Sequence, residues 1–312
     1  MTDYKKIEHP VLSIGGGINV SVTEFVYDSG NAGKKIYIQS GLHGGETSQW
    51  VLYKLHDFLM KNLHTGEVHV VAYANPLAWL QRTYYSTNGK FSQIDGKDYN
   101  RCFSDSAAAD TNSLICQKLA ELAARCDFAV DLHTSKMSNP FAIYTKPEYV
   151  PYIKALGLTY NQFSDDAAVP ALHGTFNACL DRRHVPNITV ECGGHDEYNQ
   201  DKIQKVYDAL TRLLNYINGK AEIENSGNIY RFEIRKKTHA PTSGLVNYLK
   251  TNGETVAKGE IIAELYSPED LSAPQTITAG ETGILHVLNP SHIVWQGDIV
   301  AEVIPQNDLV LL

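Results

Sequence analysis

Histidine and glutamate residues with the spacing of a metal site lie early in the chain, in Gly41-Leu-His43-Gly-Gly-Glu46. Imidazole nitrogens and carboxylate oxygens are ordinary zinc ligands, and a catalytic zinc site keeps three protein ligands and one open position. The glycines let the backbone pass close to an ion. His-x-x-Glu alone is a weak signal, because a loop histidine before a helix-capping glutamate gives the same pattern.

A third candidate ligand, His133, ends the apolar segment Val130-Asp-Leu-His133. The carboxyl end of a strand in a parallel sheet opens into a crevice where ligands bind. Asp131 lies two residues earlier and faces the same side of the strand, so it can accept the second ring proton of His133. A buried structural histidine is the alternative for His133 alone. Together with His43 and Glu46 it predicts one zinc ion per chain.

Two further positions carry groups suited to catalysis or substrate binding. Glu191 ends the segment Ile188-Thr-Val-Glu191, where a carboxylate facing the zinc can take a proton from water and pass it to a leaving nitrogen. The neighbours Asn100 and Arg101 offer an amide and a guanidinium fork for a substrate carboxylate. The alternatives are a hydrogen-bond acceptor for the loop after Glu191 and a turn with a surface arginine.

These side chains must be positioned by alternating strands and helices. Hydrophobic patterning predicts strands over 35–40, 68–73, 128–133 and 188–191, and helices over 46–62, 112–125 and 200–217. The long polar stretch 81–111 is predicted to be a functional loop. The alternation predicts an α/β layered domain with a largely parallel sheet.

The pattern changes past Asn218-Gly219, and from about Ile229 only short strands are predicted. Lys258-Gly-Glu-Ile-Ile-Ala-Glu-Leu265 recurs as Gln296-Gly-Asp-Ile-Val-Ala-Glu-Val303, which predicts a pseudo-symmetric β-sandwich. The region resembles biotinyl- and lipoyl-type hammerhead domains, which present a modified lysine between their halves. The link at 266–275 has no lysine. We therefore expect two domains, 1–226 and 227–312, the second serving as a scaffold or pocket wall and not as a carrier.

Composition excludes several classes of function. The 312-residue chain has a formal net charge of −8, which argues against nucleic acid or an anionic membrane as a partner. No apolar run approaches the roughly 20 residues of a membrane span, and the N-terminal segment does not read as a signal peptide. Five cysteines without a Cys-x-x-Cys pair predict no disulfide framework and favour the reducing cytoplasm. A homo-oligomer is compatible with the sequence.

Taken in order, the motifs resemble the succinylglutamate desuccinylase/aspartoacylase family of carboxypeptidase-A-like zinc hydrolases. The resemblance covers roughly residues 35–220. Its motifs are His43-Gly-Gly-Glu46, Asn75-Pro76, Asp98-Tyr-Asn100-Arg101, Asp131-Leu-His133 and Glu191-Cys-Gly-Gly194. The sequence departs from the family pattern at Gly45, where members often carry Asn or Asp, at Tyr99, where Leu is usual, and in a longer loop over 82–95. The resemblance implies a three-layer α/β/α zinc-hydrolase domain with a mostly parallel mixed sheet, followed by a C-terminal all-β domain.

The expected reaction is zinc-dependent hydrolysis of the amide bond of an N-acyl amino acid. Glu191 is expected to act as the base, Arg82 to stabilise the oxyanion, and Asn100 and Arg101 to hold a substrate carboxylate. Whether Arg82, Arg182 or Arg183 reaches the substrate stays open. So do two rival functions: a zinc carboxypeptidase acting on a short peptide, which needs only a different pocket, and a non-catalytic ligand-binding protein on the same fold.

Overall fold

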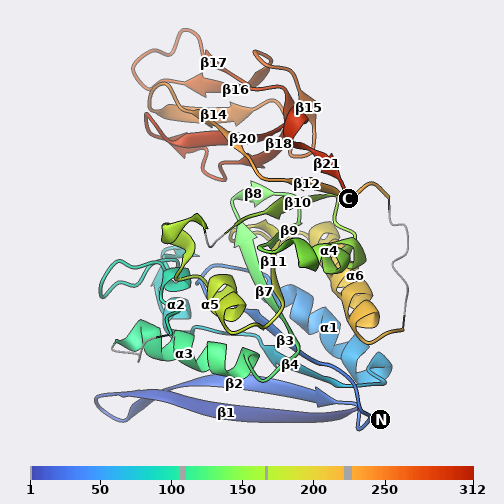
Figure 1. The fold of residues 1–312 in the computed structure, drawn as a ribbon. Coiled ribbons are helices and arrows are strands. Elements are labelled where there is room, and N and C mark those ends of the chain that lie inside the picture. Colours follow the sequence, from blue (N-terminus) through green and yellow to red (C-terminus); the bar gives the residue numbers. More distant parts are fainter. Residues whose placement is uncertain (1, 106–109, 166–167, 221–226) are drawn as a thin grey trace.

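The computed structural model describes residues 2–105, 110–165, 168–220 and 227–312. An α/β region forms the larger part, and an all-β region made by the C-terminal residues stacks on one end of it (Figure 1). The expected domain boundary at 226/227 adjoins residues 221–226, which lie outside the described part of the chain.

A mixed ten-stranded sheet organises the α/β region, with the strand order β1-β2-β4-β3-β7-β11-β9-β10-β12-β21. The four strands that carry or adjoin the site residues are parallel to one another: β4 (Glu67–Val71), β3 (Lys35–Ser40), β7 (Phe128–Ser135) and β11 (Asn187–Gly194). Parallel strands place their carboxyl ends at one edge of the sheet. The sheet is less parallel than the sequence predicts, because β1, β2 and β21 add antiparallel edges and β9 runs antiparallel to β11.

Helices cover both faces of this sheet and make three layers (Figure 1). On one face lie α1 (Gln49–Asn62), α4 (Val150–Leu156) and α6 (Gln200–Ile217), and on the other α3 (Thr111–Ala123) and α5 (Phe176–Arg182). Alternation along β3 divides the two cores: Ile36 and Ile38 pack with the first group, and Tyr37 packs with the second. Because both faces are buried, the central strands are rich in apolar residues, such as Phe128, Ala129 and Val130 of β7.

Most predicted elements are present, with shifted ends. The helix expected over 46–62 begins only at Gln49, because Gly44 and Gly45 make a turn and Glu46 is held by contacts with histidines. The described residues of the predicted loop 81–111 form short elements: β5 (Arg82–Thr83), β6 (Ser86–Thr87) and the 3-10 helix η1 (Tyr99–Arg101). The short helix α2 (Pro76–Trp79) precedes it, capped by Asn75.

Several elements were not anticipated from the sequence. The hairpin of β1 (Asp3–Ile14) and β2 (Ile18–Asp28) extends one edge of the sheet. Between β7 and α5 the chain also forms short elements, namely β8 (Met137–Ser138), β9 (Phe141–Tyr144) and β10 (Tyr160–Phe163), with 3-10 turns at Pro147–Tyr149 and Pro170–Leu172.

The C-terminal region contributes four strands to each of two layers that enclose one core. One has the order β17-β16-β14-β19 and the other β13-β20-β18-β15. The repeated segments occupy equivalent places, in β16 (Ile261–Tyr266) and β20 (Ile299–Pro305). The remaining strands are β13 (Lys236–His239), β14 (Gly244–Tyr248), β15 (Thr255–Val256), β17 (Gln275–Thr278), β18 (Gly283–Leu288) and β19 (Ile293–Val294).

Two strand pairings join the two regions. β8, which follows the His133 strand, pairs with β18, so Ser138 lies opposite Val287. β12 (Tyr230–Phe232) and β21 (Val310–Leu311) extend the large sheet, with a 3-10 turn at Gln306–Asp308 between β20 and β21. The C-terminal residues therefore belong partly to the large sheet. Among the described helices, none combines the length and the apolar character that crossing a membrane requires.

Candidate metal centre and active site

His43 and Glu46 lie on the loop between β3 and α1, whose path depends on two glycines. A Cβ added to Gly44 would lie 2.3 Å from the backbone oxygen of Ala78. Gly45 has a φ of +78°, and a Cβ there would lie 2.6 Å from Nε2 of His195. The position of Gly44 leaves no room for a side chain, and Gly45 has a left-handed backbone conformation that residues other than glycine rarely adopt. The turn carries the chain back so that His43 and Glu46 face the end of β7.

The three predicted ligands converge. The Nδ1 atoms of His43 and His133 lie 2.9 Å and 3.0 Å from Oε1 of Glu46. All three side chains are buried, and one donor atom from each lies within 4.8 Å of the others. These residues could hold a metal ion.

Each histidine uses its other ring nitrogen on a carboxylate. Nε2 of His133 lies 2.8 Å from Oδ2 of Asp131, as the strand geometry predicts, and Nε2 of His43 lies 2.9 Å from Oδ1 of Asp98. A ring that donates its Nε2 proton keeps a lone pair on Nδ1. Both lone pairs then face Glu46, which is the donor set of two imidazoles and one carboxylate that suits zinc.

The electrostatics of the cluster are consistent with a cation between these groups. Burial disfavours the charged form of each group, but the carboxylates of Glu46, Asp98 and Asp131 raise the pKa of both histidines above its ordinary value. The two imidazoles in turn hold the pKa of the Glu46 carboxyl below its usual range, against the effect of burial. Because positive charge at this point is stabilised by three carboxylates, a divalent ion suits the site.

A cavity of about 260 Å³ opens onto the cluster. Several residues that line it carry buried polar atoms without a hydrogen-bond partner in the described chain: Oε2 of Glu46, Oε2 of Glu191, Oγ1 of Thr134 and Oε1 of Gln162. Buried polar atoms are normally paired, so their concentration in one cavity indicates a place for a ligand. The free Oε2 of Glu46 and the facing Nδ1 atoms fit a metal ion.

Glu191 lies on β11, directly opposite His133 in the parallel pairing of β11 with β7. Neighbouring strands are about 4.8 Å apart, so its carboxyl lines the cavity beside the cluster. Burial raises the pKa of Glu191 above its ordinary value, although Lys90 and Arg235 act in the opposite direction. A carboxyl in such a position can accept and return a proton.

Asn100 and Arg101 also line this cavity. The Asn100 side chain is held through its Oδ1, which accepts from the backbone N–H of Phe176 at 2.9 Å, and its Nδ2 lies 3.4 Å from Nε2 of His133. Arg101 is exposed and donates from Nη1 to the Asn100 carbonyl at 2.7 Å. Asn100 is therefore held in one orientation beside His133, and the Arg101 guanidinium is accessible to a ligand in the cavity.

The other candidate arginines lie elsewhere. Arg82 is exposed on β5, outside the described lining of the cavity. Arg182 and Arg183 both pair with Asp105, the second at 3.6 Å. The cavity instead has two cationic side chains that the sequence did not single out, Lys90 and Arg235.

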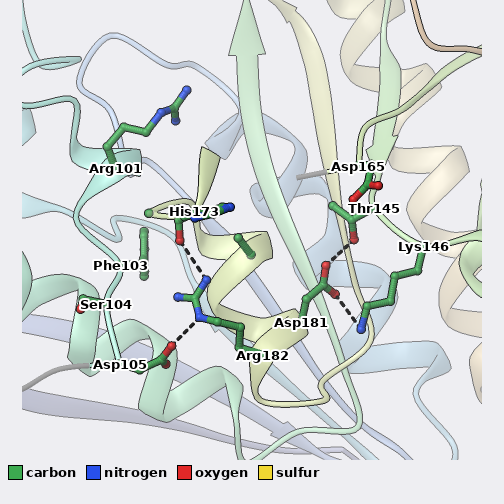
Figure 2. Close-up of a pocket in the computed structure, with 12 residues that line it drawn as sticks. Arg101, Phe103, Ser104, Asp105, Thr145, Lys146, Asp165, His173, Asp181 and Arg182 are labelled. Carbon is green, nitrogen blue, oxygen red and sulfur yellow. Dashed lines mark hydrogen bonds and ion pairs between the residues drawn. The ribbon is translucent and has the colours of Figure 1, made fainter. Parts of the chain in front are cut away.

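A second cavity, of about 910 Å³, lies on the far side of Arg101. Figure 2 shows that its charged side chains are largely paired: Arg182 with Asp105, and Lys146 with Asp181 at 3.6 Å. Asp181 also accepts from the hydroxyls of Thr145 and Tyr149. Arg101 points away from these pairs (Figure 2). The charged side chains of the larger cavity are thus largely paired with one another, whereas the smaller cavity has buried polar atoms without a partner among the described residues.

Comparison with known proteins agrees with this geometry. The family model for the succinylglutamate desuccinylase/aspartoacylase catalytic domain matches residues 32–217. No curated protein sequence matches the chain. A crystal structure of a succinylglutamate desuccinylase/aspartoacylase from Shewanella frigidimarina is similar, with a TM-score of 0.86 and 18% identity, over 100% of this chain and 99% of that one.

Two further solved structures share the fold over nearly the full length. A family protein from Shewanella amazonensis has a TM-score of 0.84 and 20% identity, with 99% of this chain and 100% of that chain covered. The product-bound ectoine utilization protein EutE (DoeB) from Ruegeria pomeroyi has a TM-score of 0.80 and 19% identity, with 98% and 95% covered. These likenesses concern the fold, and the family model concerns the catalytic domain. The chain belongs to the succinylglutamate desuccinylase/aspartoacylase family.

Proposed function

We propose that the protein is a zinc-dependent hydrolase that cleaves the amide bond of an N-acyl amino acid, with one zinc ion per chain. The observation that carries the proposal is the convergence of the Nδ1 atoms of His43 and His133 on Glu46, with each Nε2 held by a carboxylate. Such second partners fix the tautomer of a metal-binding histidine.

A zinc ion held by His43, Glu46 and His133 would polarise the amide carbonyl and lower the pKa of water. Glu191 accepts the proton of the attacking water and returns it to the amide nitrogen as the C–N bond breaks. Asn100 and Arg101 hold a carboxylate of the substrate. This places the amide bond between Glu191 and the three metal ligands. For Arg82, a role in stabilising the oxyanion requires the loop around β5 to move toward the cavity, so we assign that role preferentially to Lys90, which lines the cavity.

We extend the proposal to the chain's organisation and location. Residues 1–226 would form the catalytic domain, and 227–312 a hammerhead-like β domain that walls the cavity. The absence of a lysine from the link at 266–275 supports a non-carrier role, and an added cofactor mass on the protein from a host with biotinyl and lipoyl ligases would contradict it. All five cysteines are buried and unpaired, which supports a cytoplasmic location.

The proposal is tested with zinc-loaded protein, N-acetyl- and N-succinyl-amino acids, and dipeptides, with free amine as the readout. Glu191→Gln should keep its zinc and its melting temperature while kcat falls about 10²- to 10⁴-fold, because the amide cannot accept the proton. Preferential cleavage of dipeptides would instead indicate a carboxypeptidase. A folded, zinc-replete and fully active Gln variant would contradict the assignment of the base.

A further inference from the structure

Arg235 is a cation that the C-terminal part of the chain contributes to the active-site cavity. It lies between β12, the strand that extends the large sheet, and β13, the first strand of the all-β region. Its side chain lines the same cavity as His43, Glu46 and Glu191. In sequence it belongs to a short Arg-Lys-Lys run that indicates no function, so only the fold reveals its position.

One acidic residue contacts Arg235, and another fixes the segment that precedes it. Nη1 of Arg235 lies 3.0 Å from Oε2 of Glu302, a buried residue of β20. Asp308 fixes the segment before Arg235, because it accepts from the backbone N–H groups of Glu233 and Ile234 at 2.8 Å and 2.7 Å. A guanidinium has five N–H donors, and the contact with Glu302 uses one nitrogen. The others remain for a ligand, and the side chain is 27% exposed.

The charges around Glu302 leave a cationic excess. Glu302 is shared by Arg235 and by Lys136, whose Nζ lies 3.3 Å from Oε1. One carboxylate therefore faces two cations. Gln162, which lines the same cavity, has a buried amide oxygen without a partner in the described chain. Since the O and N atoms of an amide are assigned from hydrogen-bond partners, Gln162 can turn either group toward a ligand.

We propose that Arg235 is a specificity-determining residue that binds a carboxylate of the substrate remote from the amide to be cleaved. The inference rests on the proposed hydrolase function and adds a second carboxylate site to the one assigned to Arg101. The substrate then carries two carboxylates, one for each guanidinium. The second carboxylate can belong to the acyl group or to the side chain of the amino acid.

The test uses two pairs of probes, each differing only in a carboxylate and its carboxamide. N-acetyl-L-glutamate and N-acetyl-L-glutamine examine the amine side, and N-succinyl-L-alanine and N-succinamoyl-L-alanine examine the acyl side. In Arg235→Met the KM of the carboxylate member of one pair should rise about 10- to 100-fold, as expected for the loss of a charge-assisted hydrogen bond, while kcat and the carboxamide values stay close to wild type.

Three further variants separate ligand binding from structural effects. Arg235→Lys should restore part of the preference, because it keeps the charge but not the fork. Glu302→Gln, which loosens Arg235, should give a smaller rise in KM for the same probe. Lys236→Ala removes an exposed neighbouring cation and should change nothing. Equal losses on carboxylate and carboxamide in Arg235→Met would mean a merely structural role and overturn the inference.

Calorimetric titration with the same probes separates this inference from the hydrolase proposal. If wild type binds one carboxylate more tightly than its carboxamide, and Arg235→Met loses that preference, the inference holds even without hydrolysis. If wild type shows no preference in either pair, the inference is overturned even when hydrolysis occurs.

Discussion

The Nε2 atom of His43 lies 2.9 Å from the Oδ1 atom of Asp98, a residue 55 positions further along the chain. Asp98 also accepts from the backbone N–H of Asn100 at 2.9 Å, so one carboxylate orients a candidate metal ligand and starts the turn that carries Asn100 and Arg101. The metal centre and the substrate-binding turn are therefore joined through a single side chain.

We predict that Asp98→Asn binds zinc about 10- to 100-fold more weakly, because a carboxamide supports the His43 tautomer less well than a carboxylate. Competition with a chelator measures the change. Asp95→Asn, an exposed position in the same loop, is the matched control, and His133→Ala should lose most of the metal. Unchanged zinc affinity in Asp98→Asn would show that this contact does not support the site.

Arg101→Ala is expected to raise the KM of carboxylate-bearing substrates. If the bound carboxylate is desolvated, the fall in kcat/KM should correspond to a loss of roughly 2–5 kcal/mol of transition-state stabilisation. The accessible position of Arg101 at the cavity mouth favours the lower end of this range. Steady-state kinetics with N-acyl amino acids and their α-carboxamides provide the measurement. Equal rates for both in the wild type would contradict the role of Arg101 as a carboxylate anchor.

Acid should destabilise the protein through His286. Burial between Phe141 and Phe232, and secondarily the Arg235 charge, lowers the pKa of His286 to about 3. The unfolded chain binds a proton at this residue below its ordinary pKa of 6.5 and the folded chain does not, so stability is present above pH 6.5 and is lost as the pH falls toward 3.

Each unit by which the pH falls in that interval lowers the free energy of unfolding by about 1.4 kcal/mol. Between pH 6.5 and 5 the free energy of unfolding should therefore fall by about 2 kcal/mol less in His286→Gln than in the wild type. Urea unfolding measures this difference. His239→Gln, which removes an exposed imidazole of the same β region, serves as the comparison. Parallel pH dependence in wild type and His286→Gln would rule out this residue.

The predictable parts of the structure are those with a periodic apolar signal. The helix Gln200–Ile217 and the strand Lys35–Ser40 lie where the sequence predicts them, because their buried residues repeat with the period of the element. β1 is mostly exposed along its length, so it offers no alternating pattern from which to infer a strand. Its place is set by pairing with β2.

The same limit applies to the site. His43, Glu46 and His133 form recognisable motifs at strand ends, and Asp131 follows from the period of its strand. The partnership of His43 with Asp98 and the approach of Arg235 depend on contacts between distant segments, which spacing does not encode. Local sequence also cannot reveal that a cation such as Arg82 is exposed outside the cavity.

The pairing of β21 with β12 bears on the order in which the protein is made. Residues 306–312 supply Asp308, which fixes the segment before Arg235, and Val310, which pairs with Arg231. A chain emerging from the ribosome presents its N-terminal residues first, so the cavity wall closes only after residues 306–312 have been synthesised. Removal of residues 306–312 should leave zinc binding by the earlier segments intact while substrate affinity falls. Loss of both together would show that formation of the metal centre itself requires residues 306–312.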